Sequence, residues 1–388
     1  MKAPALRRAV LLLAWAIPAS GAVENSIARA RRSLDQIEAA RSPEEQRRAA
    51  ALLADDMSLG EEPRPAGALS ASFAVNSQSA LNRAESAGAR QEVAQSRSKA
   101  ASGFDEELQR RFREILRVVR GGWGAPIGPE AKRPRYLLVK GLYGDHISDY
   151  MEGNLRRLRS LGLEADFVPV HTDSAYEENL KLIEQAVAAE QSVVLLGHSR
   201  GGVLIHDWYR AAPTASKAKV RRVILVQAPL WGSEAADWIS DRWYARAILN
   251  GLALLPGWED PLEGVLELTS SKRKEVMMGL PELSPGDLKK IFTVASSFDS
   301  EADDERHQDM AASERIIRAM TGRSNDGLVA VESALVPGSD AVFMEDFDHE
   351  DSVLEHPGWF KRLRGRRPLD DVRVGDFTEA LVRAAVQP

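Results

Sequence analysis

The sequence predicts an α/β fold with a mostly parallel central sheet and helices on both of its faces. Short apolar runs alternate with segments of helical pattern along residues 135–300. The apolar runs are 136–140, 165–170, 192–196, 222–227 and 291–296, and the helical segments between them are 148–161, 176–190 and 202–211. Two parallel strands need a long crossover, usually a helix, so this alternation indicates βαβ units and a sheet covered on both faces.

Composition supports a large core and excludes several kinds of site. Hydrophobic residues make up 44% of the 388 residues, and cysteine is absent. Without cysteine there are no disulfides, iron–sulfur clusters, thiolate zinc sites or cysteine nucleophiles. The net charge is -6, and residues 136–388 carry 29 basic against 41 acidic side chains. An acidic main body argues against nucleic acid as a partner.

Residues 1–22 have the layout of a secretory signal peptide. A short basic start precedes an apolar run at 9–17, and Ser20 and Ala22 place small residues at the -3 and -1 positions of a cut after Ala22. The apolar run is too short to span a bilayer comfortably. We therefore expect export, to the periplasm or to the extracellular medium.

Residues 23–134 are expected to form a helical or partly disordered N-terminal extension. Up to about residue 101 the sequence is rich in Ala, Arg, Ser, Gln and Glu and poor in large apolar residues, so it buries little. The segment 104–120 differs, because its apolar residues recur every three or four positions, as in an amphipathic helix. The extension is interpreted as either a propeptide or a docking arm.

The strongest local motif is the pentapeptide Gly197-His198-Ser199-Arg200-Gly201, a G-x-S-x-G sequence. A β-branched strand precedes it and a helical pattern follows it. In a nucleophile elbow the serine lies on a strained strand-to-helix turn, and side chains at the glycine positions would collide with neighbouring backbone. The helix that begins there also directs amide groups toward developing negative charge. Ser199 is therefore predicted to be a nucleophile.

In these motifs the chain resembles the lipase and esterase branch of the α/β-hydrolases, and it is similar to secreted bacterial lipases of the lactonizing type. The resemblance covers roughly 135–360. The segment 136–145 looks like the first core strand and its oxyanion turn, with Lys140 in the place usually held by histidine. The resemblance implies that the backbone N–H groups of Leu142 and Arg200 form the oxyanion hole. It also implies a hydrolase domain over 135–388, with a helical cap inserted at about 231–290.

A serine hydrolase of this fold carries its nucleophile, acid and base in that chain order. The histidines suitably far beyond Ser199 are His307, His349 and His356. Asp326 lies in an NDG turn and His349 in a DHED stretch, and both contexts resemble the acid and base motifs of the lipases. We therefore expect Asp326 to orient His349, with His356 as the alternative base. The acidic residues around His349 are expected to favour its protonated form, so that activity needs neutral or alkaline pH.

No organic cofactor is expected. In the lipases resembled, an aspartate two residues after the base helps to bind calcium, and Asp351 holds that place, with the acidic segment 299–309 as a second source of oxygen ligands. Five tryptophans between 208 and 258 suggest either an apolar lid or the packing of the cap. The resemblance implies an acyl-ester or lipid substrate and contact with a lipid surface. An acyltransferase, a thioesterase or a non-catalytic envelope binding protein on the same scaffold remain open, as does the oligomeric state.

Overall fold

The structure is a computed structural model, which describes residues 104–242, 245–246, 249–250, 253, 257–300, 308–355 and 373–387. The predicted signal peptide and most of the N-terminal extension lie outside the described residues, as do His307, His356 and Trp243. None of the helices within these ranges combines the length and the apolar character needed to cross a membrane.

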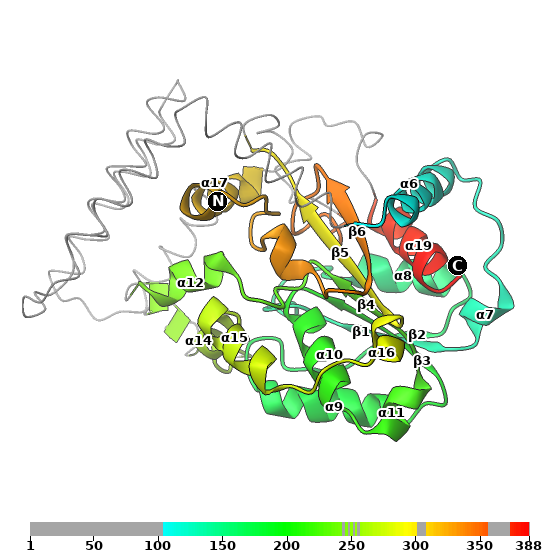
Figure 1. Ribbon diagram of the computed structural model, residues 1–388, viewed down its shortest axis with the longest axis horizontal. Helices are drawn as coiled ribbons and strands as arrows, with labels where there is room; N and C mark the ends of the chain where they lie inside the picture. The colour runs from blue at the N-terminus through cyan, green and yellow to red at the C-terminus, as the bar shows by residue number, and fades with distance from the viewer. Residues whose placement is uncertain are drawn as a thin grey trace, which may run out of the picture. The chain divides into compact units, whose positions relative to one another are not determined.

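A single sheet of six parallel strands forms the centre of the described structure (Figure 1). Its spatial order is β2-β1-β3-β4-β5-β6. The strands are β1 (Arg135–Val139), β2 (Ala165–Phe167), β3 (Val193–His198), β4 (Val220–Val226), β5 (Ile291–Ser297) and β6 (Asp340–Glu345). The order reverses at β1, because β2 lies on one side of β1 and β3 on the other. Ligands of open α/β sheets bind at the carboxyl ends of the strands beside such a switch point.

The predicted α/β class and its mostly parallel sheet are confirmed. Strands β1 to β5 coincide with the five apolar runs, whereas β6 was not predicted. At this sheet edge, only Val342, Phe343 and Met344 of the strand are buried, and polar residues occupy both of its ends. Three apolar residues in a row do not distinguish a short edge strand from a loop.

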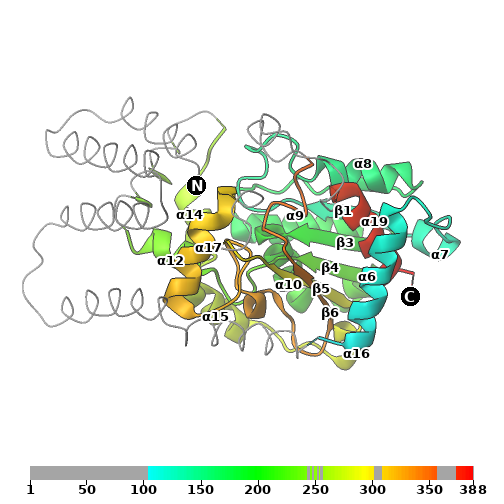
Figure 2. The same ribbon diagram turned by 90° about the horizontal axis from the view of Figure 1, so that it is seen from above.

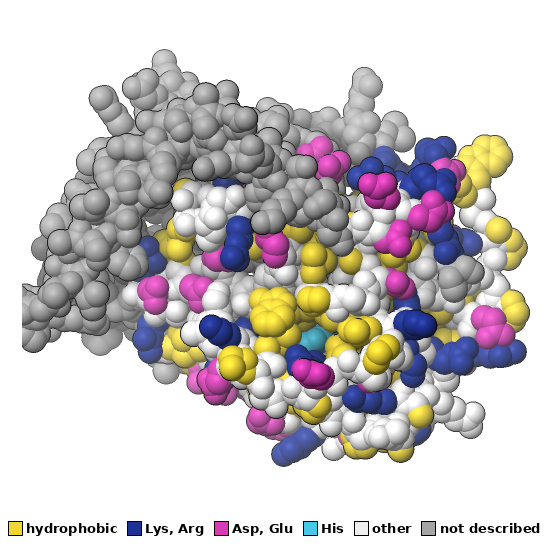
Figure 3. All heavy atoms as spheres, viewed as in Figure 1, with side chains coloured by type: hydrophobic (Ala, Val, Ile, Leu, Met, Phe, Trp, Pro, Cys, Tyr) yellow, Lys and Arg dark blue, Asp and Glu magenta, His cyan; other side chains and the backbone are white. Residues whose placement is uncertain are grey.

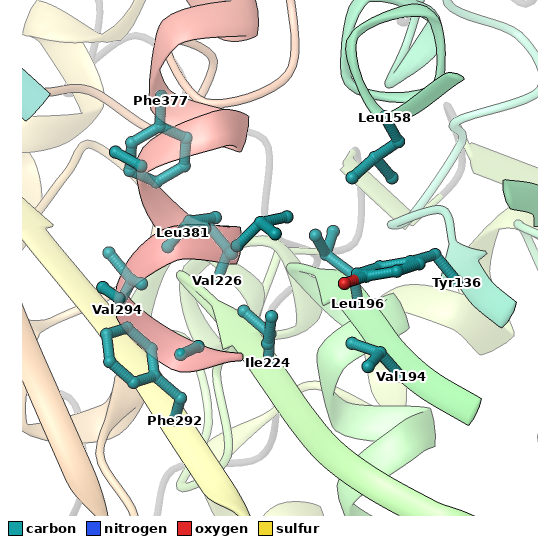
Figure 4. Packing of buried hydrophobic residues seen from close by; sticks show 14 of the residues in the cluster. Tyr136, Leu158, Val194, Leu196, Ile224, Val226, Phe292, Val294, Phe377 and Leu381 are labelled. Carbon is teal, nitrogen blue, oxygen red and sulfur yellow. The ribbon is translucent and has the colours of Figure 1, made fainter. Parts of the chain in front are cut away.

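Alternate side chains of the strands point to opposite faces, and each face is covered by helices. Helices α6 (Glu106–Arg120), α8 (Glu152–Ser160) and α19 (Val374–Ala385) cover one face, and α19 lies between the other two (Figures 1 and 2). Figure 4 shows Phe377 and Leu381 of α19 and Leu158 of α8 packed over the strands. The strand residues labelled there are Tyr136, Val194, Leu196, Ile224, Val226, Phe292 and Val294, and Leu138, Ala165, Val342 and Met344 belong to the same cluster.

Helix α6, which the sequence places in the N-terminal extension, is part of this core. Asp105 caps its first turn by accepting from the N–H groups of Glu107 and Leu108. Phe112, which is fully buried, packs against Phe377 of α19 with ring centroids 6.4 Å apart. The amphipathic pattern of 104–120 therefore serves to cover the sheet. The short helix α7 (Pro129–Lys132) connects α6 to β1.

The opposite face is covered by α9 (Tyr176–Ala188) and α10 (Arg200–Ala211), followed by α11 (Thr214–Lys219). Between β4 and β5 the chain forms α12 (Glu234–Ser240), α14 (Pro261–Leu266), α15 (Ser270–Gly279) and α16 (Pro285–Leu288). Helix α17 (Gln308–Thr321) and a 3₁₀ turn, η1 (Val331–Ala334), precede β6. A buried ion pair joins α15 to α10, in which Arg273 donates two hydrogen bonds, of 2.7 and 2.8 Å, to Asp207.

Candidate active site

The turns after β1 and β3 meet at the switch point of the sheet. Gly141 follows β1 and Ser199 follows β3. A Cβ atom added to Gly141 would lie 2.9 Å from the Ser199 Cβ and 3.0 Å from the His198 carbonyl oxygen, so the two turns are in close contact. The predicted nucleophile and the predicted oxyanion turn thus lie together at the carboxyl edge.

Ser199 has the backbone conformation expected of a nucleophile elbow. Its φ of 54° and ψ of -127° lie in a region that side-chain-bearing residues rarely adopt. The strained turn is held on both sides, because the Ser199 N–H donates to the Val226 carbonyl and the Ser199 carbonyl accepts from Gly202 and Val203. Helix α10 begins at the next residue, so its N-terminus is directed at the site.

The two glycines of the motif are required by close backbone approaches. A Cβ atom on Gly201 would lie 2.2 Å from the Val139 carbonyl oxygen, and one on Gly197 would lie 2.6 Å from the Gly202 nitrogen. Neither neighbour is a flexible side chain that could move aside. The spacing of the pentapeptide thus allows α10 to start directly against β1.

Asp326 and His349 form a buried hydrogen-bonded pair. His349 Nδ1 lies 2.9 Å from Asp326 Oδ2, and the side chains are 6% and 1% exposed. The Asp326 Oδ1 atom accepts from the N–H groups of Leu328 and Val329, and the His349 N–H donates to the Asp326 carbonyl at 2.9 Å. These bonds fix the carboxylate and bind the two loops together over a separation of 23 residues.

The electrostatics of this pair favour a protonated imidazole. Burial by itself would lower the pKa of His349, but the Asp326 carboxylate, with Asp348 and Glu350, outweighs burial and raises this pKa above its ordinary value. In the neutral state the proton lies on Nδ1, where the carboxylate accepts it, which leaves Nε2 as the basic nitrogen.

His349 lies next to the serine turn without a hydrogen bond to the serine. Its ring centroid is 4.7 Å from that of His198, the residue before Ser199. Within the described residues the Ser199 hydroxyl forms no hydrogen bond with His349. Nucleophile–base hydrogen bonds are often long before substrate binds and shorten in the complex.

His198 connects the serine turn to the loop of His349, which the sequence did not reveal. Its Nε2 atom lies 3.0 Å from the His349 carbonyl oxygen and 3.2 Å from Gln227 Oε1, and its Nδ1 atom lies beside the Tyr150 hydroxyl. Two acceptors at Nε2 assign the proton to that nitrogen, so Nδ1 accepts from Tyr150. Burial, and then the nearby charge of His349, hold the pKa of His198 well below its ordinary value. His198 is therefore a neutral structural bridge.

Gln227 also supports the loop of His349, and sequence reasoning missed it as well. Its amide nitrogen donates to the Asp348 carbonyl at 2.8 Å and to Ser296 Oγ at 2.6 Å, and its oxygen accepts from Ser352 Oγ at 2.6 Å. Gln227 is completely buried and has a φ of 51°. The sequence did offer one signal for Gln227. It is a polar residue directly after the buried strand β4, at the sheet edge that carries the serine.

The backbone N–H groups of Leu142 and Arg200 are free of competing backbone bonds. In the described part of the chain neither donates to a backbone carbonyl. The Arg200 side chain is 1% exposed, and its Nε atom donates to Glu267 Oε2 at 2.7 Å. Burial raises the pKa of Glu267 although Arg200 opposes this effect.

Asp351, the calcium candidate, takes part in a turn of the histidine loop. Its Oδ2 atom accepts from the Asp348 N–H at 2.9 Å, and Asp348 Oδ1 accepts from the N–H groups of Glu350 and Asp351. Across the described ranges, no three His, Asp or Glu side chains converge as a metal site would need. These residues by themselves do not fit a calcium site, and most of the second expected source, 301–307, lies outside the described residues.

His206 belongs to the scaffold and not to this site. It is buried in α10, where its Nδ1 atom lies 2.9 Å from Asp207 Oδ1, and burial lowers its pKa.

On the face shown in Figure 3, hydrophobic side chains surround a histidine, and basic and acidic side chains are interspersed around them.

No protein-family model and no curated protein sequence matches the chain. Among solved structures, a metagenomic carboxyl esterase matches with a TM-score of 0.56 and 18% identity, covering 71% of this chain and 91% of that one. The Staphylococcus hyicus lipase matches with a TM-score of 0.45 and 16% identity, over 58% and 91% of the two chains. A mature Bacillus licheniformis lipase matches with a TM-score of 0.42 and 21% identity, over 58% and 89%.

The fold is established by the match to the metagenomic esterase together with the parallel sheet, the helices on both faces and the strained serine turn after β3. The chain has the α/β-hydrolase fold.

Proposed function

We propose that this protein is an exported serine ester hydrolase of the lipase and esterase type. The observation that carries the proposal is the buried pair of His349 and Asp326, 2.9 Å apart, beside a serine on a strained strand-to-helix turn. A carboxylate that holds a neutral imidazole next to a serine is the arrangement that hydrolysis by an acyl-enzyme requires. The carboxyl esterase that shares the fold supports the same class of reaction.

In the proposed reaction, His349 Nε2 removes the hydroxyl proton as Ser199 Oγ bonds to the carbonyl carbon of the ester. The carbonyl oxygen then carries the negative charge, which the N–H groups of Leu142 and Arg200 stabilise. The tetrahedral intermediate expels the alcohol, which takes the proton from His349, and an acyl-enzyme remains. Water, deprotonated by His349, attacks this ester, and the acid is released as Ser199 regains its proton. Asp326 stays ionised throughout and stabilises the imidazolium.

The proposed substrate is an acyl ester or a lipid, which the enzyme meets at a lipid surface. Two tryptophans support an apolar substrate site at the carboxyl edge. Trp231 follows β4 and is 44% exposed, and Trp258 stacks on His146 beside the oxyanion turn with ring centroids 3.6 Å apart. Trp208, by contrast, is buried in the core and donates to Glu184, so it belongs to the packing.

Export follows from residues 1–22, and the extension after them is proposed to be a propeptide or a docking arm. If it is removed on maturation, we expect the cut to fall before Phe104. Phe104 packs on Phe343 of β6, and α6 covers the sheet, so a later cut would expose core residues. The N-terminal residue of the protein recovered from the exported fraction tests this expectation.

The test uses purified mature protein with p-nitrophenyl esters from acetyl to palmitoyl, and Ser199→Ala as the control. We expect turnover by the wild type, its loss in the variant, and labelling of Ser199 by a fluorophosphonate probe. The chain-length optimum distinguishes an esterase from a lipase. An added alcohol or an acyl thioester distinguishes an acyltransferase or a thioesterase. Absence of both turnover and labelling would contradict the proposal and favour a binding scaffold.

A further inference from the structure

Helix α14, in the segment between β4 and β5, contacts both of the turns that carry the proposed oxyanion donors. One turn follows β1 and contains Leu142, and the other follows β3 and contains Arg200. An oxyanion hole needs its donors about 2.7–3.1 Å from a single oxygen position, so their separation has to be fixed to within a few tenths of an ångström. Contacts that hold both turns are therefore part of the geometry of the hole.

At its C-terminal end, α14 holds Arg200. Glu267, the residue after the helix, accepts from Arg200 Nε at 2.7 Å, and the other guanidinium nitrogens donate to the carbonyls of His171 and Ser174 at 2.9 and 2.8 Å. Arg200 is 1% exposed, so its charge has been removed from water and depends on these acceptors. Glu267 is the acceptor that carries a charge. Its second oxygen, Oε1, is buried and has no hydrogen-bond partner among the described residues.

At its N-terminal end, α14 holds the turn of Leu142. Tyr143 donates from its hydroxyl to the Pro261 carbonyl at 2.6 Å, and Trp258 packs edge-on against the Tyr143 ring at 5.1 Å. A Cβ atom on Gly264 would lie 2.5 Å from Leu142 Cδ1 and 2.7 Å from the Asp173 carbonyl oxygen. The helix backbone therefore lies directly against the Leu142 side chain, and only glycine fits at this position.

We propose that α14 sets the distance between the two oxyanion donors, and that Glu267 is a positioning residue acting through Arg200. This inference rests on the proposed function. Because both donors are backbone N–H groups of other residues, a substitution at Glu267 retains them and can change only their positions. Glu267 draws the first residue of α10 toward α14, while Tyr143 and Gly264 hold the other turn against the same helix.

The arrangement also implies that α14 stays in place when substrate enters. Lifting α14 from the turns would break the Arg200–Glu267 ion pair and leave a buried guanidinium with carbonyl acceptors alone, which is costly. It would at the same time separate Leu142 from its support. Movement of α14 would therefore dismantle the oxyanion hole that catalysis requires.

The experiment compares Glu267→Ala with Glu267→Gln, and uses Glu379→Ala as a matched control. Glu379 is likewise a buried carboxylate paired with arginines, Arg157 and Arg383, but it lies on α19. Steady-state kinetics with a p-nitrophenyl ester give kcat and KM. The Ki of an alkyl boronic acid, which forms a tetrahedral adduct with the serine, reports on the oxyanion hole. Thermal melting reports on stability.

We expect Glu267→Ala to lower kcat about tenfold or more, with KM changed less than about twofold, since the donors act on the transition state. The Ki of the boronic acid should rise by a similar factor. Glu267→Gln should recover most of kcat, because its amide oxygen still accepts from Arg200. Glu379→Ala should lower the melting temperature with kcat and Ki unchanged.

The inference is wrong if Glu267→Ala keeps the wild-type kcat and Ki, if it changes KM alone, or if Glu379→Ala affects kcat and Ki equally. Failure of the proposed function gives a different result. The wild type would then show neither turnover nor fluorophosphonate labelling of Ser199, and both the function and the positioning role of Glu267 would be overturned.

Discussion

The His198 imidazole donates from Nε2 to the His349 backbone carbonyl, 3.0 Å away, so the residue that precedes Ser199 supports the loop that carries the proposed base. The other nitrogen of His198 accepts from Tyr150, whose hydroxyl lies against the turn after β1, 2.3 Å from where a Cβ atom on Gly141 would be. A continuous chain of hydrogen bonds thus joins Tyr150, the serine turn and the histidine loop, and Tyr150 packs against the turn after β1. In a buried site such a chain restricts all three to one arrangement.

Replacing Gln227 tests the support of the histidine loop. Gln227→Leu leaves the Asp348 carbonyl and the hydroxyls of Ser296 and Ser352 without this partner. Each buried polar group left unsatisfied costs about 1–3 kcal/mol, so we expect a lower free energy of unfolding in urea and a lower kcat. Gln109→Leu is the control, because Gln109 bonds both backbone groups of Phe343 on β6. Gln109→Leu should lower the free energy of unfolding without lowering kcat. An equal loss of kcat in the two variants would contradict the role of Gln227 in supporting the histidine loop.

Replacing Asp326 by asparagine tests the proposed acid. The amide cannot stabilise an imidazolium, and it favours the wrong tautomer of His349, with its proton on Nε2. Comparable changes in other Ser-His-Asp enzymes lower kcat by about 10⁴-fold, and we expect a loss of that order. A kcat/KM within tenfold of the wild type would assign the acid to another residue. Circular dichroism of the variant checks that the fold is retained.

The pH profile of kcat/KM should rise on the acid side with the deprotonation of His349. Since nearby carboxylates raise the pKa of His349, the rise is expected above its ordinary value, and activity is expected at neutral and alkaline pH. Glu350→Gln removes one of these charges, lowers this pKa, and should shift the rise to lower pH. Glu345→Gln, at an exposed residue of β6, should leave the profile unchanged. A shift to higher pH in Glu350→Gln would contradict the argument.

Adding a methyl group to Gly201 tests the close approach behind the serine turn. A Cβ at this position would lie 2.2 and 2.5 Å from the carbonyl oxygens of Val139 and Lys140. Gly201→Ala should therefore lower the free energy of unfolding by about 1–3 kcal/mol or more, measured by urea denaturation. Gly279→Ala, in α15, meets nothing within 4 Å and should be neutral or stabilising by about 0.5–1 kcal/mol. Equal effects in both variants would rule out the steric explanation.

A calcium requirement remains a prediction, which chelation tests. If Asp351 and the acidic segment 299–309 bind calcium, added calcium should raise the melting temperature and EDTA should lower it, by mass action on the folded state. Asp351→Asn should then abolish the difference. Identical melting curves in calcium and in EDTA would contradict the calcium prediction.

The sequence by itself determined the features that depend on residues close to one another along the chain. Buried parallel strands are continuous apolar runs, so β1, β3, β4 and β5 could be found from composition and periodicity. The G-x-S-x-G motif predicted a strained serine because glycine has to lie on either side of such a turn, and Ser199 has that conformation. Asp326 and His349 came from resemblance to the lipases, and the structure places them in hydrogen-bond contact.

Only the tertiary structure decided the contacts between distant segments. Gln227 and His198 act on a loop more than 120 residues away, and Glu267 holds an arginine 67 residues before it. Strand β6 is held in the sheet by its pairing with β5, and α6 is held over the sheet by its packing against α19. No pattern of neighbouring residues in the sequence reveals these contacts. Which group a side chain bonds or packs against depends on what folding brings to it. The sequence thus specifies the serine turn, and the packing of the sheet and helices specifies what surrounds it.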